Sequence, residues 1–177
     1  MQEVVLDTNA LIDLMNLSCW EALADLPGFR FWIVENVREE VTREDQRKAL
    51  EGALASGLIG ETKVGEGEAC GMEELATYAR LKGILGDGEA AGLAVAHHRG
   101  WIFVSYEKGR LRREAGAMLG ERFWSTPLLL ATMAQAGVCT FEHMETAIAS
   151  LGSGSSKTQH LSRLVAEARS LPASENA

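Results

Sequence analysis

The sequence predicts an α/β fold, a three-layer sandwich with a central parallel sheet. Two observations predict it. Short apolar segments of strand length alternate along the chain with segments whose apolar residues recur at helical spacing, and strands that alternate with helices imply a parallel sheet covered on both faces. The chain has 177 residues, 46% of them hydrophobic, which suits one globular domain with an appendage.

The first half of the chain is expected to form three strands and their helices. Val4–Leu6 is a short apolar run that ends at Asp7, and apolar residues at helical spacing follow it. Phe29–Val34 is rich in aromatic and β-branched residues and predicts the second strand. One polar helical stretch follows, with an inward face marked by Val37, Val41 and Leu50. A third strand is expected at 59–64 and a helix at 72–81.

The second half continues the alternation after a break at Gly83, Gly86 and Gly88. A buried helix is expected at 89–98, a strand at 101–104, a basic helix at 108–119 and a short strand at 122–124. Pro127 fits the first turn of the next helix, and another helix is expected at 141–151.

A composition change divides the chain at Gly152–Ser156, a small polar stretch typical of flexible linkers. We therefore expect a domain at 1–151 and, at 152–177, a linker followed by an amphipathic helix with its apolar positions between Leu161 and Leu171. That helix either packs on its own domain or docks on a partner subunit.

Composition narrows the class of protein. The apolar stretches are far shorter than the roughly 20 residues that span a bilayer, so no membrane segment and a cytoplasmic location are expected. Cys19, Cys70 and Cys139 lack a Cys-x-x-Cys pair, and we expect them to be reduced packing residues. The four histidines, His97, His98, His143 and His160, form no metal-binding pattern and are expected at the surface or in packing. A net charge of −8 argues against wrapping duplex DNA by bulk attraction.

Acidic residues gather where a parallel sheet binds ligands, at the carboxyl ends of its strands. Asp7 ends the first strand, although it also suits the N-cap of the next helix. Glu40 follows Val37 by about one turn, so it points either toward the sheet or into a solvated acidic face. Glu89 begins the buried helix, and Glu107 follows the fourth strand.

Converging carboxylates repel one another unless protons or cations neutralise them. Oxygen ligands without cysteine or histidine favour Mg²⁺ or Mn²⁺ over zinc or copper. Such clusters hydrolyse phosphate esters, because the cation activates water and stabilises charge on the leaving oxygen.

Several segments resemble PIN-domain nucleases, including the VapC-like toxins of bacterial toxin–antitoxin pairs. The opening Val-Val-Leu-Asp7-Thr8-Asn9-Ala-Leu11 resembles the first strand of that family. Val37-Arg-Glu-Glu40-Val41 is similar to its second acidic position and Gly88-Glu89-Ala90 to its third. Phe103 to Arg110 and Ser125 to Leu129 match the later segments, so the resemblance covers about residues 3–150.

The resemblance implies a Mg²⁺- or Mn²⁺-dependent endoribonuclease that acts as a homodimer, with a small antitoxin as partner if the chain is a toxin. Carried over by position, Asp7, Glu40 and Glu89 would bind the metal and activate water, and Asn9 or Thr8 would brace the loop that holds Asp7. Asp87 ranks lower because it precedes the helix and suits a cap.

One position departs from the family pattern. The family usually carries an aspartate directly after the fourth strand, where this chain has Ser105-Tyr106. Glu107 comes one or two positions later and is the candidate to complete the catalytic set. The alternative is a catalytically weak or inactive PIN-like module that binds RNA or protein. A further alternative is a subunit of a larger RNA-processing assembly.

RNA binding requires positive charge near these acids. The stretch from Arg99 to Arg113 contains Arg99, Lys108, Arg110, Arg112 and Arg113. It is either an ordinary solvated helix face or a set of phosphate contacts. Arg110 is the first candidate for a phosphate clamp, with Lys108, Asn9 and Ser105 as further substrate-binding candidates.

Overall fold

A single five-stranded parallel sheet forms the centre of the protein in a computed structural model, which describes residues 1–66, 71–106, 108–152 and 154–171. The strand order is β3-β2-β1-β4-β5. The strands are β1 (Gln2–Leu6), β2 (Phe29–Val34), β3 (Gly60–Thr62), β4 (Ile102–Val104) and β5 (Phe123–Trp124). Since every neighbouring pair is parallel, the α/β sandwich predicted from the sequence is confirmed.

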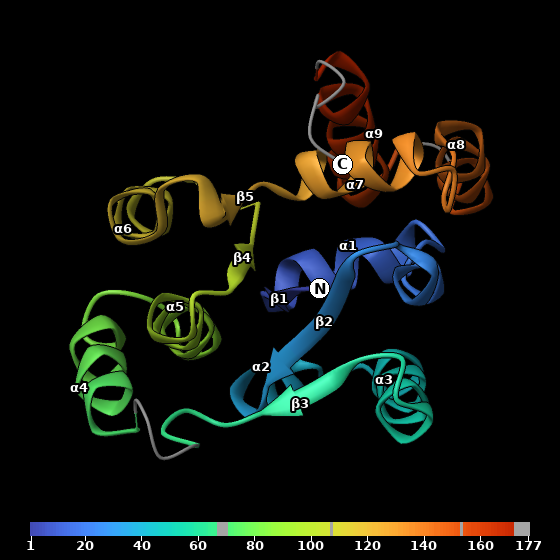
Figure 1. Cartoon of the computed structure of the whole chain (residues 1–177). Helices are drawn as coiled ribbons and strands as arrows, with labels where there is room; N and C mark the ends of the chain where they lie inside the picture. The colour runs from blue at the N-terminus through green and yellow to red at the C-terminus, as the bar shows by residue number, and fades with distance from the viewer. Residues whose placement is uncertain (67–70, 107, 153, 172–177) are drawn as a thin grey trace.

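Helices connect the strands and cover both faces of the sheet (Figure 1). The first group contains α1 (Thr8–Asn16), the 3₁₀ helix η1 (Glu21–Asp25), α2 (Glu35–Glu40), α3 (Glu44–Ser56), α4 (Gly71–Lys82) and α5 (Asp87–Arg99). The second group contains α6 (Arg110–Leu119), η2 (Gly120–Arg122), α7 (Thr126–Gln135), α8 (Phe141–Ser150) and α9 (Ser156–Ser170).

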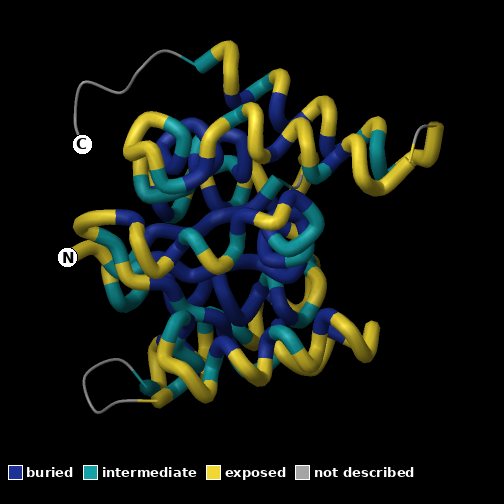
Figure 2. Tube along the Cα trace, turned by 90° about the vertical axis from the view of Figure 1, so that its right-hand side faces the viewer, coloured by how far each residue is buried: buried dark blue, intermediate teal, exposed yellow. Residues whose placement is uncertain are grey.

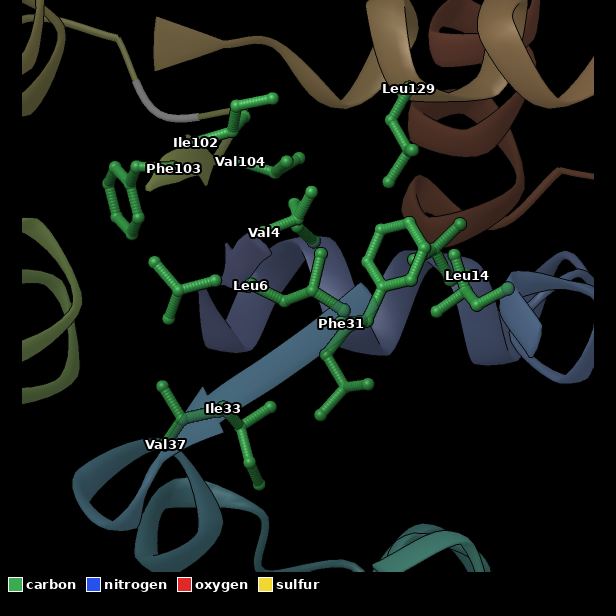
Figure 3. Close-up of a cluster of buried hydrophobic side chains, with 14 of the residues drawn as sticks. Val4, Leu6, Leu14, Phe31, Ile33, Val37, Ile102, Phe103, Val104 and Leu129 are labelled. Carbon is green, nitrogen blue, oxygen red and sulfur yellow. The ribbon is translucent and has the colours of Figure 1, made fainter. Parts of the chain in front are cut away.

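Alternation along the strands divides the core between the two faces. Val5 and Phe103 are neighbours on one face, where Phe103 packs against Gly92 of α5. Val4 and Phe31 are neighbours on the opposite face, together with Leu129 of α7 (Figure 3). Residues on both faces are buried, so the middle of the molecule is apolar and the exposed positions lie on the outer helices (Figure 2).

The polar stretch after β2 forms two helices rather than the one that the sequence predicted. The first helix, α2, ends at Glu40, where Val41 adopts extended backbone angles, and α3 begins after Arg43. Val41 and Thr42 are both β-branched, which weakens helix formation at this point. The break leaves Glu40 at the carboxyl end of a short helix.

The C-terminal helix α9 packs on its own chain. Its apolar residues Leu161, Leu164, Val165 and Ala168 are buried, and the helix lies against α7 and α8. His160 of α9 also hydrogen bonds to the buried carboxylate of Asp13 on α1, at 3.0 Å to Oδ2. Burial is the main cause that raises the pKa of Asp13, and the hydrogen bond to His160 opposes it.

The expectation that all three cysteines are reduced is wrong for two of them. Cys19 and Cys139 form a disulfide across 120 residues of sequence, between the segment after α1 and the segment before α8. Cys70 lies outside the described residues. The fold creates this proximity, and sequence spacing carries no sign of it.

Within the described part of the chain, none of the helices has both the length and the apolar character that a membrane crossing would require.

Candidate active site

Asp7 lies at the carboxyl end of β1, in the middle of the sheet, and only 1% of its surface is exposed. It is the N-cap of α1, and its Oδ1 accepts a hydrogen bond of 2.8 Å from the Thr8 backbone nitrogen. Its Oδ2 accepts a hydrogen bond of 2.8 Å from the Ser105 hydroxyl, which follows β4. The capping role weighed for Asp7 is therefore present, and the same carboxylate also reaches the neighbouring strand.

Glu40 is joined to this position through Thr8. The Thr8 hydroxyl donates a hydrogen bond to Glu40 Oε2. The backbone nitrogen of Gly88, at the start of α5, donates to Glu40 Oε1 at 2.9 Å. Of the two orientations considered for Glu40, the structure has the one directed toward the end of the sheet, although the residue remains exposed.

Close approach explains why a glycine occupies position 88. A Cβ added to Gly88 would lie 2.8 and 2.9 Å from the two carboxylate oxygens of Glu40. Such distances are shorter than carbon–oxygen contacts allow, so a side chain at position 88 would displace the Glu40 carboxylate from the start of α5.

Glu89 is the next residue of α5 and is half-buried. Its Oε2 accepts a hydrogen bond of 3.0 Å from the Gly86 backbone nitrogen, in a capping-box arrangement. The sequence-predicted metal ligands Asp7, Glu40 and Glu89 thus lie directly after β1, at the end of α2 and at the start of α5. Hydrogen bonds through Thr8 and Gly88 connect these segments, but among the described residues the three carboxylates do not form a group whose ligand atoms all lie within 4.8 Å of one another. The carboxylates of Glu40 and Glu89 both accept from backbone nitrogens at the start of α5, where the positive end of the helix dipole favours negative charge.

Asp87 does not cap α5 as the sequence suggested, because Gly86 holds that position. Its carboxylate instead receives hydrogen bonds from Asn36 of α2 at 2.7 Å and Tyr78 of α4 at 2.7 Å. Lys82 forms an ion pair with it at 2.6 Å. These contacts, with Lys82 the strongest, lower the pKa of Asp87 to about 2. The cluster fixes the start of α5 between α2 and α4.

The basic stretch is smaller than the sequence predicted. Lys108, Arg110, Arg112 and Arg113 are exposed at and after the start of α6, which follows β4 on the same edge of the sheet as Asp7. Lys108 Nζ lies 5.4 Å from the ring centre of Tyr106.

Arg99 does not belong to this surface, and its inclusion was wrong. Its guanidinium forms an ion pair of 2.8 Å with Glu74, whose side chain is 1% exposed, and donates to the Thr62 hydroxyl. Arg99 ends α5, whereas the acidic residues lie at its beginning. A charge pattern along the sequence does not distinguish a buried ion pair from a free cation.

The other predicted residues divide into three cases. Ser105 is 1% exposed and faces Asp7, so its hydroxyl orients a carboxylate rather than an exposed substrate group. Asn9 is exposed at the start of α1, and it is Thr8 that links Asp7 with Glu40. Glu107 lies outside the described residues.

Sequence reasoning missed the groups that hold the start of α5, namely Asn36, Tyr78 and Lys82. The one available signal was the spacing of Tyr78 and Lys82, which share a face of a helix at i and i+4. Nothing in the sequence connects either of them with Asp87.

Comparison with known proteins adds the family. A family model described as a PIN domain matches residues 3–167, a range that includes all of the sheet except Gln2 and most of α9. No curated protein and no solved structure gives a significant match. PIN domains are generally nucleases and typically use divalent metal ions. The fold, the acidic edge and the match over nearly the entire chain agree, and the chain belongs to the PIN-domain family.

Proposed function

We propose that this protein is a Mg²⁺- or Mn²⁺-dependent endoribonuclease that hydrolyses phosphodiester bonds in RNA. The observation that carries the proposal is the connected acidic edge. Asp7 is buried at the end of β1, Thr8 links it to Glu40, and Glu40 contacts the residue before Glu89.

The donor atoms at this edge are of the kind that a hard divalent cation binds. Asp7, Glu40 and Glu89 offer only carboxylate oxygens, which Mg²⁺ and Mn²⁺ prefer as ligands. A bound cation would supply Lewis acidity, which lowers the pKa of water and offsets the charge that develops on phosphate oxygens.

Neighbouring residues hold the carboxylates of this edge in fixed orientations. The Ser105 hydroxyl and the Thr8 backbone nitrogen orient the two oxygens of Asp7. The Gly88 nitrogen and the Thr8 hydroxyl orient those of Glu40. Lys108 and Arg110 are exposed on the same edge and are our candidates for contacts with the RNA phosphates. Glu107 stays a candidate to complete the catalytic set.

Glu39 and Glu40 provide a matched test, because both are exposed acids at the end of α2. A pool of structured RNAs is incubated with the chain and Mg²⁺ or Mn²⁺, with a chelator as the blank. Glu40→Gln should slow cleavage by more than about 100-fold, because even groups that only orient metal ligands contribute about 10- to 100-fold. Glu39→Gln should cleave like the parent chain. Equal rates for the two variants would contradict the assigned role of Glu40.

A second function, an RNA- or protein-binding PIN module without efficient cleavage, is favoured by one observation. Ser105 occupies the place where the family usually has an acid, and it donates to Asp7 instead of adding a carboxylate. RNA binding by the parent chain without cleavage in either metal would support this function. Cleavage that disappears in Asp7→Asn would exclude it.

A toxin role, a small antitoxin partner and a homodimer are narrower hypotheses that rest on the family resemblance. Induced expression should arrest growth if the chain is a toxin, and Asp7→Asn should relieve the arrest. Sedimentation of the purified chain measures the dimer separately, and a monomer at micromolar concentration would exclude it.

A further inference from the structure

A second group of ligand-type side chains lies away from the acidic edge, where the end of α1 meets the start of α8 (Figure 1). It consists of Cys19, Cys139 and His143. The Cα atoms of the two cysteines are 6.0 Å apart, and one ligand atom from each of the three residues lies within 4.8 Å of the others. Among the described residues, no other set of three histidine, cysteine or acidic side chains has its ligand atoms this close together.

The donor atoms of this group differ in kind from those of the acidic edge. Two sulfurs and one imidazole nitrogen suit a borderline cation of the zinc class, whereas Mg²⁺ prefers oxygen. Cys139 and His143 are four residues apart, with Cys139 in the segment just before α8 and His143 in its first turn, so one short stretch of chain supplies two of the three ligands. Short local spacings of this kind are usual for zinc ligands.

The histidine is oriented by the backbone. His143 Nε2 lies 2.9 Å from the carbonyl oxygen of Ser18, the residue before Cys19. When Nε2 donates to this carbonyl, Nδ1 carries the free lone pair, and a backbone acceptor on the second nitrogen is the usual support of a metal-binding imidazole. Ser18 has φ of 54°, an uncommon value for a residue other than glycine and one that often marks functional sites.

The site has room for a fourth ligand. A cavity of about 390 Å³ opens beside it and is lined by Cys139 and His143 together with Glu21 and Asp25 of η1. Water from the cavity would supply the fourth ligand of a tetrahedral site.

The disulfide and the cation exclude each other, since thiolates rather than a disulfide bind metal. A dithiol reductant would exchange with the disulfide, becoming oxidised by two electrons and leaving one thiol on Cys19 and one on Cys139. Each thiol then loses its proton when it binds the cation.

We propose that Cys19, Cys139 and His143 of the reduced chain form a binding site for a thiophilic divalent cation of the zinc class. The Cys19–Cys139 disulfide is the form in which this site is closed. The proposal is independent of the carboxylates at the acidic edge.

Cobalt binding tests the proposal, because thiolate ligands give Co²⁺ an intense charge-transfer absorption. The full chain is reduced with a phosphine, freed of reductant and titrated with Co²⁺, and Zn²⁺ is then added as competitor. We expect one Co²⁺ per chain with thiolate absorption, displaced by Zn²⁺, and no such absorption in the oxidised chain. A reduced chain without thiolate absorption overturns the proposal.

Variants identify the ligands. His143 is exposed, so His143→Ala should fold and should weaken binding at least tenfold. Cys19→Ala should abolish the thiolate absorption, with circular dichroism as the check on folding. Asp7→Asn and Cys70→Ser are the controls for the acidic edge and for the third cysteine, and both should bind like the parent. Unchanged affinity in His143→Ala, or loss of binding in Cys70→Ser, would contradict the assigned ligands.

Discussion

At the scale of single residues, Gly88 shows how closely the acidic edge is packed. Alanine is usually the better helix former by about 1 kcal/mol. At position 88, however, its Cβ would meet both oxygens of Glu40 and displace that carboxylate. We expect Gly88→Ala to lower divalent-metal affinity at the acidic edge at least tenfold, measured by calorimetry.

Gly52 is the matched control for Gly88. It lies inside α3, and a Cβ added there would meet no atom within 4 Å. Gly52→Ala should raise the free energy of unfolding by up to about 1 kcal/mol and leave metal affinity unchanged. If Gly88→Ala leaves divalent-metal affinity as unchanged as Gly52→Ala does, the close contact at Gly88 does not position the Glu40 carboxylate.

Thr126 provides a second prediction at this scale. The residue is fully buried at the start of α7, and its hydroxyl oxygen has no hydrogen-bond partner among the described residues. A buried hydroxyl without a partner costs about 1–3 kcal/mol. We therefore expect Thr126→Val to raise the free energy of unfolding by about 1 kcal/mol in urea denaturation.

Thr132 of the same helix is the control, because its hydroxyl donates to the Leu128 carbonyl oxygen at 2.9 Å. Thr132→Val should be neutral or destabilising. A gain in Thr132→Val equal to that in Thr126→Val would mean that the missing partner is not the cause.

The candidate site was predictable from the sequence where position along an element determined it. Asp7 directly follows a predicted strand, and Glu89 directly follows a glycine break before a predicted helix. Because ligands bind at the carboxyl ends of parallel strands, these two positions were enough to predict the acidic edge. In the sequence, Ser105 stands where the family usually has an acidic residue. Its hydrogen bond to Asp7 could not be predicted, because it depends on how β4 lies beside β1. The prediction that Arg99 belongs to the basic surface was wrong because its ion-pair partner, Glu74, is 25 residues away in the sequence.

At the scale of elements, Asp87 connects the start of α5 with α2 and α4. Its pKa is about 2 in the folded chain, below the 3.8 of an unperturbed aspartate. A lowered pKa stabilises the fold fully above about pH 4, and this contribution is lost as the pH falls from about 4 to about 2. Asp87→Asn should thus lower the melting temperature most above pH 4, and the difference should shrink toward pH 2.

Salt and a second carboxylate check this assignment. The Asp87 side chain is 37% exposed, so added salt should weaken the effect. Asp25→Asn, at an exposed position of η1, is the control variant. A melting-temperature difference for Asp87→Asn that does not vary between pH 2 and pH 6 would contradict the ion-pair explanation.

Element order was predictable because hydrophobic periodicity reports burial directly, and the five strands lie near their expected positions. The division between α2 and α3 was not predictable from the sequence, because both helices are polar and the break depends on the backbone geometry at Val41. The amphipathic pattern of α9 predicted its buried face, but the identity of the covering helices α7 and α8 is a tertiary property.

At the scale of the whole molecule, strand order and long-range pairing lie beyond sequence patterns. β1 occupies the centre of the sheet although it is first in the chain, and this places Asp7 beside elements from the middle of the sequence. The Cys19–Cys139 disulfide belongs to the same class of information, because its partners are 120 residues apart.

That separation leads to the last prediction. The disulfide closes most of the chain into one loop, which restricts the unfolded state, and native disulfides contribute about 2–5 kcal/mol. Guanidinium denaturation of the oxidised and reduced chains should differ by this amount. The Cys19→Ala, Cys139→Ala double variant should be insensitive to reductant, whereas Cys70→Ser should respond like the parent. If the parent chain unfolds at the same denaturant concentration with and without reductant, the two sulfurs are thiols in solution, and the metal site alone would explain their proximity.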